Sequence, residues 1–208
     1  MVAEPVSRPT RDQRREAILA IAHAVFLEFG FEGASMSQVA ARLGGSKGTL
    51  YSYFDSKEAL FEALVAESCA RNGAAVFDAP AAAAMPARLT HIARAYLTLV
   101  GSDWATRMLQ VVAAEARRRP DVGRMFFDAG PGEAITRLAR HIDEFVAAGK
   151  LHADDSREAA ETFLTLCRGT FHLRRMLGQE PEPSPARIAR EADRAVGQFL
   201  KLYGVEAD

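Results

Sequence analysis

The chain has 208 residues, of which 49% are apolar and 25% are charged, and its formal net charge is −1. A chain of this length can bury a substantial core in one or two domains. It has no apolar run long enough to span a membrane and no signal-peptide pattern, so we expect a cytoplasmic protein with no membrane partner. The near-neutral charge means that any nucleic-acid binding must depend on the local placement of cations.

Helices are the expected secondary structure along the whole chain. Good helix formers (Ala, Leu and Arg) are abundant, whereas alternating runs of Val, Ile and Thr are absent. Residues 1–10 contain two prolines and are predicted to form a flexible N-terminal arm. Thr10 is a suitable N-cap for a first helix, which should run to about Phe29 and stop at Gly30.

The stretch from Ser35 to Phe61 predicts two short helices followed by the start of a longer one. Ser35 caps a helix over residues 36–43, and Gly44-Gly45 breaks it. Ser46 caps the next helix, which is predicted to reach about Phe54. Asp55 and Ser56 compete as caps for a fourth helix, whose apolar positions continue beyond residue 65.

The rest of the chain is predicted to be a series of longer helices joined by short turns. Residues 78–86, with two prolines, are expected to be a connector. Pro120 should end one helix and open another, which Gly130-Pro131-Gly132 should break. The other predicted helices cover residues 87–100, 103–118, 134–148, 155–177 and 184–203.

The two short helices have the composition of a helix-turn-helix. Gly44 supplies the small turn residue, and Leu43 and Leu50 can lock one helix against the other. The polar residues of the second helix are Lys47, Thr49, Tyr51 and Tyr53. Reading DNA in a groove requires such hydrogen-bonding groups on an outward face, although a small helical bundle with solvated charges has a similar pattern.

The N-terminal region resembles the TetR family of transcriptional regulators over about residues 11–65. The residues that carry the resemblance are FxExGFEGASM at the end of the first helix and then VAARLGGSKGTLYSYFDSKEALFEAL. Two C-terminal stretches, LQVVAAEARRRPDVGRMFFDAGPGEAITRLARHI and AAETFLTLCRGTFHLRRMLG, resemble the AefR-like subgroup. The resemblance implies an all-α homodimer that binds a palindromic operator in double-stranded DNA, usually as a repressor that a small-molecule inducer releases.

The resemblance also implies roles for particular residues. Lys47, Gly48 and Thr49 match the part of the recognition helix that faces bases, and Ser46 caps that helix. The positions that typically hold phosphates are matched by Tyr51, Tyr53 and Lys57. The start of the preceding helix, which also touches the DNA backbone, is matched by Ser35, Met36 and Ser37. Gly45 departs from the family pattern, which usually has an apolar residue there, and this raises the question of turn rigidity.

The last two predicted helices are candidates for the homodimer interface. The helix over residues 155–177 is apolar on two sides, whereas a helix that packs against its own chain on one side needs only one apolar side. Two such helices from each of two copies would form a four-helix interface. The candidate interface residues are Leu166, Gly169, Leu173, Leu177, Ile188, Ala192, Val196 and Phe199.

Aromatic and other apolar residues of the C-terminal region are candidates for a ligand cavity between helices, although as core residues they need no ligand. The candidates are Trp104, Met108, Phe126, Phe127, His141, Phe145, Phe163, Cys167 and His172. For His141 and His172, which lie near apolar stripes, the sequence favours a histidine that is satisfied within the core over a ligand contact. The histidine spacings match no metal motif, and we expect no metal and no cofactor.

Taken together, the sequence predicts an all-α protein of about nine helices. A three-helix DNA-binding domain with the helix-turn-helix covers residues 11–57, and a larger ligand-binding and dimerisation domain covers residues 58–208. Two alternatives to a regulator remain open. One is a small-molecule-binding protein with weakened or lost DNA binding, for which Gly45 is the argument. The other is an enzyme with Cys69 or Cys167 as nucleophile, but the sequence shows no general base at a recognisable spacing from either cysteine. The two thiols could also form a redox pair or be buried and inert.

Overall fold

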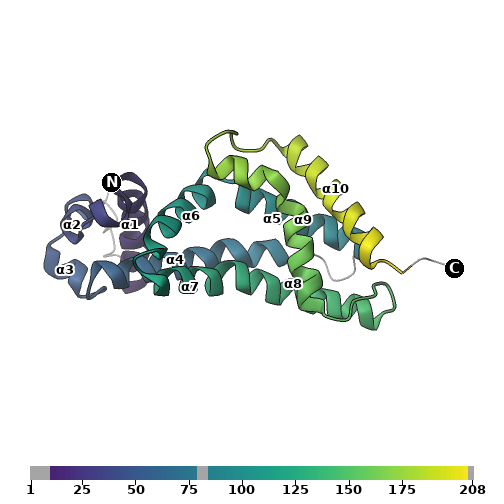
Figure 1. Cartoon of the computed structure of the whole chain (residues 1–208). Coiled ribbons are helices and arrows are strands. Elements are labelled where there is room, and N and C mark those ends of the chain that lie inside the picture. The colour runs from purple at the N-terminus through teal and green to yellow at the C-terminus, as the bar shows by residue number, and fades with distance from the viewer. Residues whose placement is uncertain (1–9, 79–83, 206–208) are drawn as a thin grey trace, which may run out of the picture. The chain divides into compact units, whose positions relative to one another are not determined.

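The computed structural model describes residues 10–78 and 84–205, and within these ranges every regular element is a helix (Figure 1). The chain divides into two compact units, one ending at Glu67 and the other beginning at Ser68. The predicted domain boundary, after residue 57, lies earlier because the fourth helix contributes its first half to the N-terminal unit. Residues 1–9 of the predicted arm and residues 79–83 of the predicted connector lie outside the described ranges.

The N-terminal unit contains four helices. They are α1 (Arg11–Gly33), α2 (Met36–Leu43), α3 (Lys47–Tyr51) and the first part of α4 (Lys57–Ala74). Thr10 caps α1 in a capping box with Gln13, as its position predicts. Gly30 has a φ of +67°, so the helical path is interrupted there even though helical residues follow. The third helix ends at Tyr51, earlier than the predicted Phe54.

Three phenylalanines at the centre of this unit join α1 to α4. The Phe61 ring lies edge-on to Phe26 and to Phe31, with centroids 4.9 and 5.0 Å away. Phe26 and Phe61 are fully buried, and Leu50 of α3 is buried as well. Aromatic side chains bury large areas and prefer this edge-to-face arrangement, so the cluster fixes the frame on which the short helices rest.

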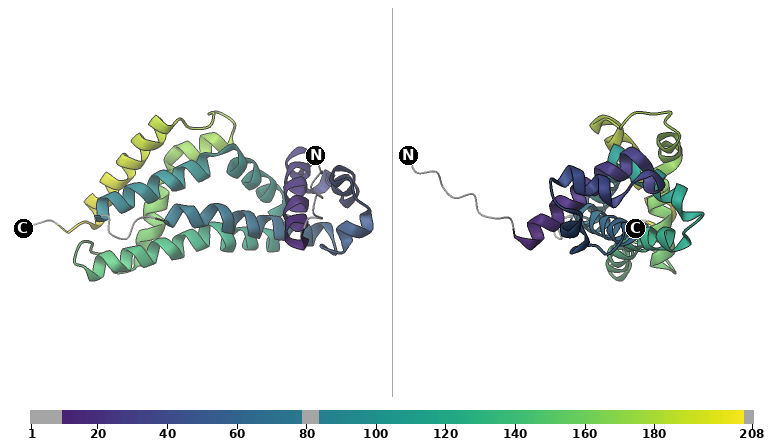
Figure 2. Two further views of the ribbon diagram at one scale, coloured as in Figure 1. Left: turned by 180° about the vertical axis from the view of Figure 1, so that it is seen from behind. Right: turned by 90° about the vertical axis from the view of Figure 1, so that its left-hand side faces the viewer.

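The C-terminal unit contains the rest of α4 and the remaining helices. These are η1 (Ala75–Phe77), α5 (Met85–Gly101), α6 (Asp103–Ala116), α7 (Pro120–Phe127), η2 (Asp128–Gly132), α8 (Glu133–Ala147), α9 (Ser156–Met176) and α10 (Pro185–Tyr203). Helices α5, α9 and α10 pack on one another, and the left view of Figure 2 shows α10 lying along the other two. In the described part of the chain, no helix is both long and apolar enough to cross a membrane.

The segment Gly130-Pro131-Gly132 does not break the helical path, in contrast to the sequence prediction. It belongs to η2, a π-helical turn that joins α7 directly to α8. A π turn pairs residues five apart, so the chain can continue past Pro131, which has no N–H to donate. The Thr136 hydroxyl donates to the Gly132 carbonyl at 2.9 Å and satisfies an oxygen at this junction.

Helix α9 is interrupted in its middle at Gly169, which has φ +46° and ψ −148°. The interruption frees backbone carbonyls, and Arg194 of α10 donates from Nη2 to the Leu166 carbonyl at 2.8 Å. A Cβ at residue 169 would lie 3.3 Å from that nitrogen, so glycine gives the guanidinium room as well as the backbone its positive φ. Gly169 therefore shapes α9 within the single chain.

Candidate functional site

The turn between α2 and α3 is closed by two backbone hydrogen bonds. Gly44 adopts the left-handed conformation, with φ +67°, at the end of α2. Its N–H donates to the Ala41 carbonyl and the Gly45 N–H donates to the Ala40 carbonyl, at 3.3 and 3.4 Å. This pair of bonds is the Schellman motif, which ends a helix at a defined angle. The turn that the sequence predicted from Gly44 is therefore formed.

Gly45 does not need to be glycine in this structure. Its φ is not in the left-handed region, and an added Cβ would meet Arg14 Nη2 at 3.5 Å and Leu43 at 3.7 Å, which are ordinary contacts. The bonds that close the turn use only backbone groups. The absence of an apolar side chain at residue 45 therefore leaves the turn geometry intact.

Helix α3 presents an exposed polar surface after a side-chain cap. Ser46 Oγ accepts the Thr49 N–H at 3.1 Å and lies 3.0 Å from the Thr49 hydroxyl. Lys47 and Gly48 are exposed, as is Tyr51, with 47% of its surface accessible. Thr49 is half-buried, and its hydroxyl is partly engaged by the cap. The base-facing candidates are therefore together on one short helix.

The start of α2 has mixed accessibility. Ser35 caps the helix, with its Oγ accepting the Gln38 N–H at 3.3 Å. Ser37 is exposed, whereas Met36 is buried with 7% of its surface accessible. Of these three candidates for backbone contact, Met36 can offer DNA little more than its main chain.

Tyr53 and Lys57 are both engaged inside the N-terminal unit. The Arg11 guanidinium lies over the Tyr53 ring, 5.8 Å from its centroid. Lys57 Nζ donates to the Phe31 carbonyl at 2.8 Å and lies 4.3 Å from the centre of the Phe31 ring. An ammonium has three donors, so Lys57 keeps two for a phosphate while its stem and charge stabilise the end of α1.

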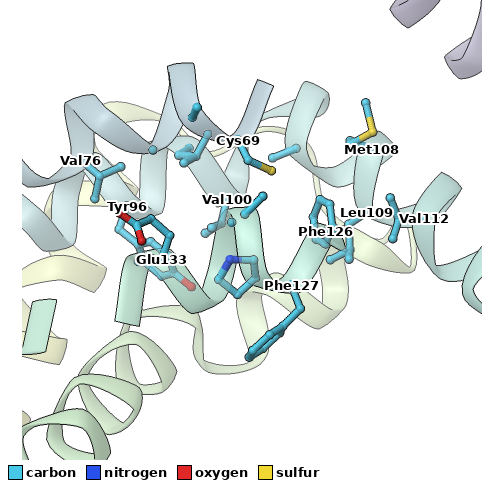
Figure 3. Close-up of a pocket in the computed structure, with 18 of the residues that line it drawn as sticks. Cys69, Val76, Tyr96, Val100, Met108, Leu109, Val112, Phe126, Phe127 and Glu133 are labelled. Atoms are coloured by element: carbon cyan, nitrogen blue, oxygen red, sulfur yellow. The ribbon is translucent and has the colours of Figure 1, made fainter. Parts of the chain in front are cut away.

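The C-terminal unit contains a cavity (Figure 3). Its volume of about 370 Å³ is typical of small-molecule sites. It is lined by residues of α4, η1, α5, α6, α7, η2, α8 and α9. Most of them are apolar; the polar side chains among them are Cys69, Tyr96, Glu133, Arg137, Arg168 and His172.

Five of the nine sequence candidates for ligand binding line this cavity: Trp104, Met108, Phe126, Phe127 and His172. The other four lie elsewhere. Phe145, Phe163 and Cys167 are buried in the helix core. His141 lies outside the lining, with its Nδ1 2.5 Å from Arg88 Nη2 and its ring stacked on Phe77. Apolar periodicity places residues on an inward face but does not distinguish a packed face from a cavity wall. These four residues are therefore not part of the cavity lining.

Several lining residues were not singled out from the sequence as ligand contacts. Tyr96 and Arg168 contribute the polar groups of α5 and α9, and Cys69 comes from α4. Gly130 and Pro131 line the cavity from η2. The sequence Gly130-Pro131-Gly132 was noted as a helix break and not as part of a ligand site. No local sequence pattern identifies Tyr96 or Arg168 as lining residues.

Burial shifts the pKa of three titratable groups in the lining, Cys69, Tyr96 and His172. It raises the pKa of the Cys69 thiol to about 11, and it raises the pKa of Tyr96 to about 12 against the opposing charge of Arg168. The pKa of His172 is lowered, mainly by burial and then by the charge of Arg168. At neutral pH the cavity therefore contains a thiol, a protonated phenol and an uncharged imidazole.

Cys69 and Cys167, on which the enzyme and redox alternatives depend, are poor nucleophiles in this structure. Burial raises the pKa of Cys167 to about 12, and that of Cys69 is raised as well. The reactive form of cysteine is the thiolate, which neither site favours at neutral pH. Among the residues that the structure describes, no three His, Cys, Asp or Glu side chains are grouped to hold a metal ion.

The candidate dimer residues divide between surface and core. Leu173 of α9 and Leu177, the residue that caps its C-terminus, have 60% and 63% of their surface exposed. Gly169 is exposed and Leu166 is half-buried. On α10, Ile188 is half-buried, whereas Ala192, Val196 and Phe199 lie inside the core of their own chain. Leu202, which is not among the candidates from the sequence, is 65% exposed. The apolar stripe of α10 is thus used within the chain, and the exposed apolar residues come mainly from α9 and the end of α10.

Comparison with known proteins gives matches along nearly the whole chain. The model of the bacterial regulatory proteins of the tetR family matches residues 18–64, and the model of the AefR-like transcriptional repressor C-terminal domain matches residues 87–205. The HTH-type transcriptional repressor AcnR of Corynebacterium glutamicum is 29% identical over 178 residues, covering 84% of this chain and 87% of AcnR.

Two solved structures are also similar. The flavonoid-responsive regulator FrrA is 34% identical, with a TM-score of 0.81, and the match covers 94% of this chain and 100% of FrrA. A TetR-family transcriptional regulator from Mesorhizobium loti MAFF303099 is 25% identical, with a TM-score of 0.84, and the match covers 95% of this chain and 100% of that one.

Proposed function

This chain belongs to the TetR family of bacterial transcriptional regulators, and from that premise we propose a ligand-responsive repressor. It binds a palindromic operator as a homodimer in the cytoplasm, and a small-molecule inducer releases it. The observation that carries the proposal is the exposed polar surface of α3, held after a closed turn in one unit, together with a cavity in the other.

In this proposal, side chains of α3 contact the DNA bases, and residues around α3 contact the phosphates and fix the position of the helix along the DNA. Lys47 offers donors to a guanine edge, and Gly48 lets the helix backbone approach closely. Tyr51, Tyr53 and Lys57 contact phosphates, assisted by the N-terminal ends of α2 and α3 at Ser35, Ser37 and Ser46. Two such helices must lie roughly 34–36 Å apart to meet successive major grooves.

The homodimer is proposed to form through α9 and the end of α10. The exposed Leu173, Leu177 and Leu202 support this surface, because large apolar side chains at such exposure favour burial against a second copy. A two-fold interface places one α3 in each half of a palindrome. The exposed residues rather than the core residues Ala192, Val196 and Phe199 make the contact.

Induction is proposed to act through α4. This helix carries Lys57 in its first turn and Cys69, which lines the cavity, further along. A ligand that binds better to a conformer with altered α3 spacing shifts the population away from the DNA-binding state. FrrA is described as flavonoid-responsive, which supports a small organic molecule as the inducer of this chain.

A gel-shift experiment with DNA from upstream of the chain's own gene tests the proposal. We expect a retarded band at low salt with the stoichiometry of one dimer per site, and we expect it to weaken steeply with added salt. Light scattering of the free protein should give the mass of a dimer. Absence of any retardation at low salt, with a folded protein, would reject the repressor and leave the ligand-binding alternative.

A further inference from the structure

The cavity of the C-terminal unit has a polar end and an apolar end. In Figure 3, Tyr96 and Glu133 lie together at one end, whereas Met108, Leu109 and Phe126 lie at the other. A ligand that fills such a cavity is amphipathic, with its polar group beside Tyr96. The charges at that end then decide which polar group is accepted.

The two charged side chains of α8 in the lining neutralise one another. Arg137 Nε donates to Glu133 Oε1 at 2.7 Å, one helical turn apart. This pair contributes little net charge to the cavity. A ligand therefore meets a polar but balanced wall on the α8 side.

Arg168 of α9 is different, because it brings a charge without a counter-ion. Among the described residues no carboxylate lies within ion-pair distance of it, and its single hydrogen bond is a long one, 3.5 Å from Nη2 to the Thr165 hydroxyl. Arg168, Tyr96 and His172 line the same cavity, and the charge of Arg168 acts against the burial that raises the pKa values of Tyr96 and Cys167. Arg168 and His172 stand on either side of the interruption at Gly169.

We propose that the cavity takes a monoanionic amphipathic ligand, an apolar carboxylic acid, whose carboxylate is bound by Arg168 and the Tyr96 hydroxyl while its apolar body lies against Met108 and Phe126. This inference rests on the proposed ligand-responsive function and assigns the chemical class of the inducer.

The protonation of the site agrees with an anion. Tyr96 keeps its proton because burial raises its pKa, so its hydroxyl can donate to a carboxylate oxygen. A guanidinium donates through a planar fork that matches a carboxylate. A neutral alcohol of the same shape leaves the charge of Arg168 without a partner, and an ammonium ligand would be repelled by it.

Three probes with the same apolar chain separate these classes: decanoate, decan-1-ol and decylammonium. Trp104 is the single tryptophan of the chain and lines the cavity, so its fluorescence reports binding directly. We expect decanoate to bind about tenfold more tightly than decan-1-ol, as a charge-assisted hydrogen bond predicts, and decylammonium to bind most weakly.

Variants assign the preference to Arg168. Arg168→Met should abolish the advantage of decanoate and leave decan-1-ol binding unchanged, whereas Arg168→Lys should keep most of it. Arg140→Met is the matched control, because Arg140 is an exposed arginine of α8 outside the lining, and it should behave as wild type. Tyr96→Phe should weaken decanoate several-fold and change decan-1-ol little.

The outcomes separate this inference from the proposed function. Equal affinities for decanoate and decan-1-ol, a preference that survives in Arg168→Met, or no change in Trp104 fluorescence with any probe would each reject the carboxylate assignment. None of these results affects the gel shift with upstream DNA, which tests the repressor independently. Tighter binding of decanoate, lost in Arg168→Met and kept in Arg140→Met, would support it.

Discussion

Lys57 Nζ donates to the Phe31 carbonyl at 2.8 Å and lies against the Phe31 ring, so one cation joins the start of α4 to the end of α1. The carbonyl belongs to the region after Gly30, where the helical path is interrupted and an oxygen needs a donor. Lys57 thus combines a structural contact with the phosphate contact proposed for it.

Lys57→Ala should weaken binding to all DNA sequences and reduce the slope of log K against log salt by about one unit. It should also lower the stability of the folded protein by about 1 kcal/mol, because the hydrogen bond from Lys57 to the Phe31 carbonyl is lost. Anisotropy titrations at several salt concentrations, well below the melting temperature, measure the first effect. Lys201→Ala is the control, because Lys201 is an exposed lysine of α10. If Lys57→Ala changed only which DNA sequence is preferred, the phosphate role of Lys57 would be contradicted.

Thr49→Val should alter which operator sequence is preferred while leaving binding to random DNA nearly unchanged. The substitution removes a hydroxyl near the proposed base contacts but no charge, so specific affinity should fall about tenfold and the salt slope should stay constant. Ser46 Oγ still accepts the Thr49 N–H, so the cap of α3 survives. Competition with randomised DNA measures the preference. Ser52→Ala, at an exposed position after α3, serves as the comparison, and equal losses on all sequences would exclude a base-reading role for Thr49.

The two turn glycines should respond in opposite ways to alanine. Gly44→Ala forces a Cβ into a left-handed conformation and should destabilise the turn by about 1 kcal/mol. Gly45→Ala meets no close contact and restricts the unfolded chain, so it should stabilise by about 0.5 kcal/mol. Native-state hydrogen exchange of amides in residues 36–54 measures both. If Gly45→Ala loosened the turn as much as Gly44→Ala, the conformation described for residue 45 would be incorrect.

Cys69 should react slowly with iodoacetamide in the folded protein and faster as pH rises. With a pKa of about 11, its thiolate is roughly one part in a thousand at pH 8, so alkylation should be on the order of a hundredfold slower than for the unfolded chain. The rate should rise about tenfold per pH unit until the pKa is approached. Mass spectrometry of timed samples follows each cysteine separately. A rate at pH 7 that matches the unfolded chain would reopen the nucleophile and redox hypotheses.

The caps and the turn of the DNA-binding unit could be predicted because their signals are local. Ser35 and Ser46 each bond an N–H three residues ahead, and Gly44 is needed for a φ that other residues avoid. Such interactions depend on a few neighbouring residues, so the sequence alone identifies them. The π turn at Gly130-Pro131-Gly132 was not predictable in this way, because local chemistry permits both a break and a continued helix.

The tertiary structure decided which apolar residues form a cavity and which fill the core. Phe126 and Phe163 have the same chemical character, yet the first lines the cavity and the second is fully buried among α9 and α10. The difference depends on the positions of helices far apart in the chain, which helical periodicity does not contain. The same holds for Arg168 and Tyr96, which α9 and α5 bring to the lining of one cavity. The sequence by itself therefore determined the helix-turn-helix and its family, while packing decided where a ligand can lie and which charge receives it.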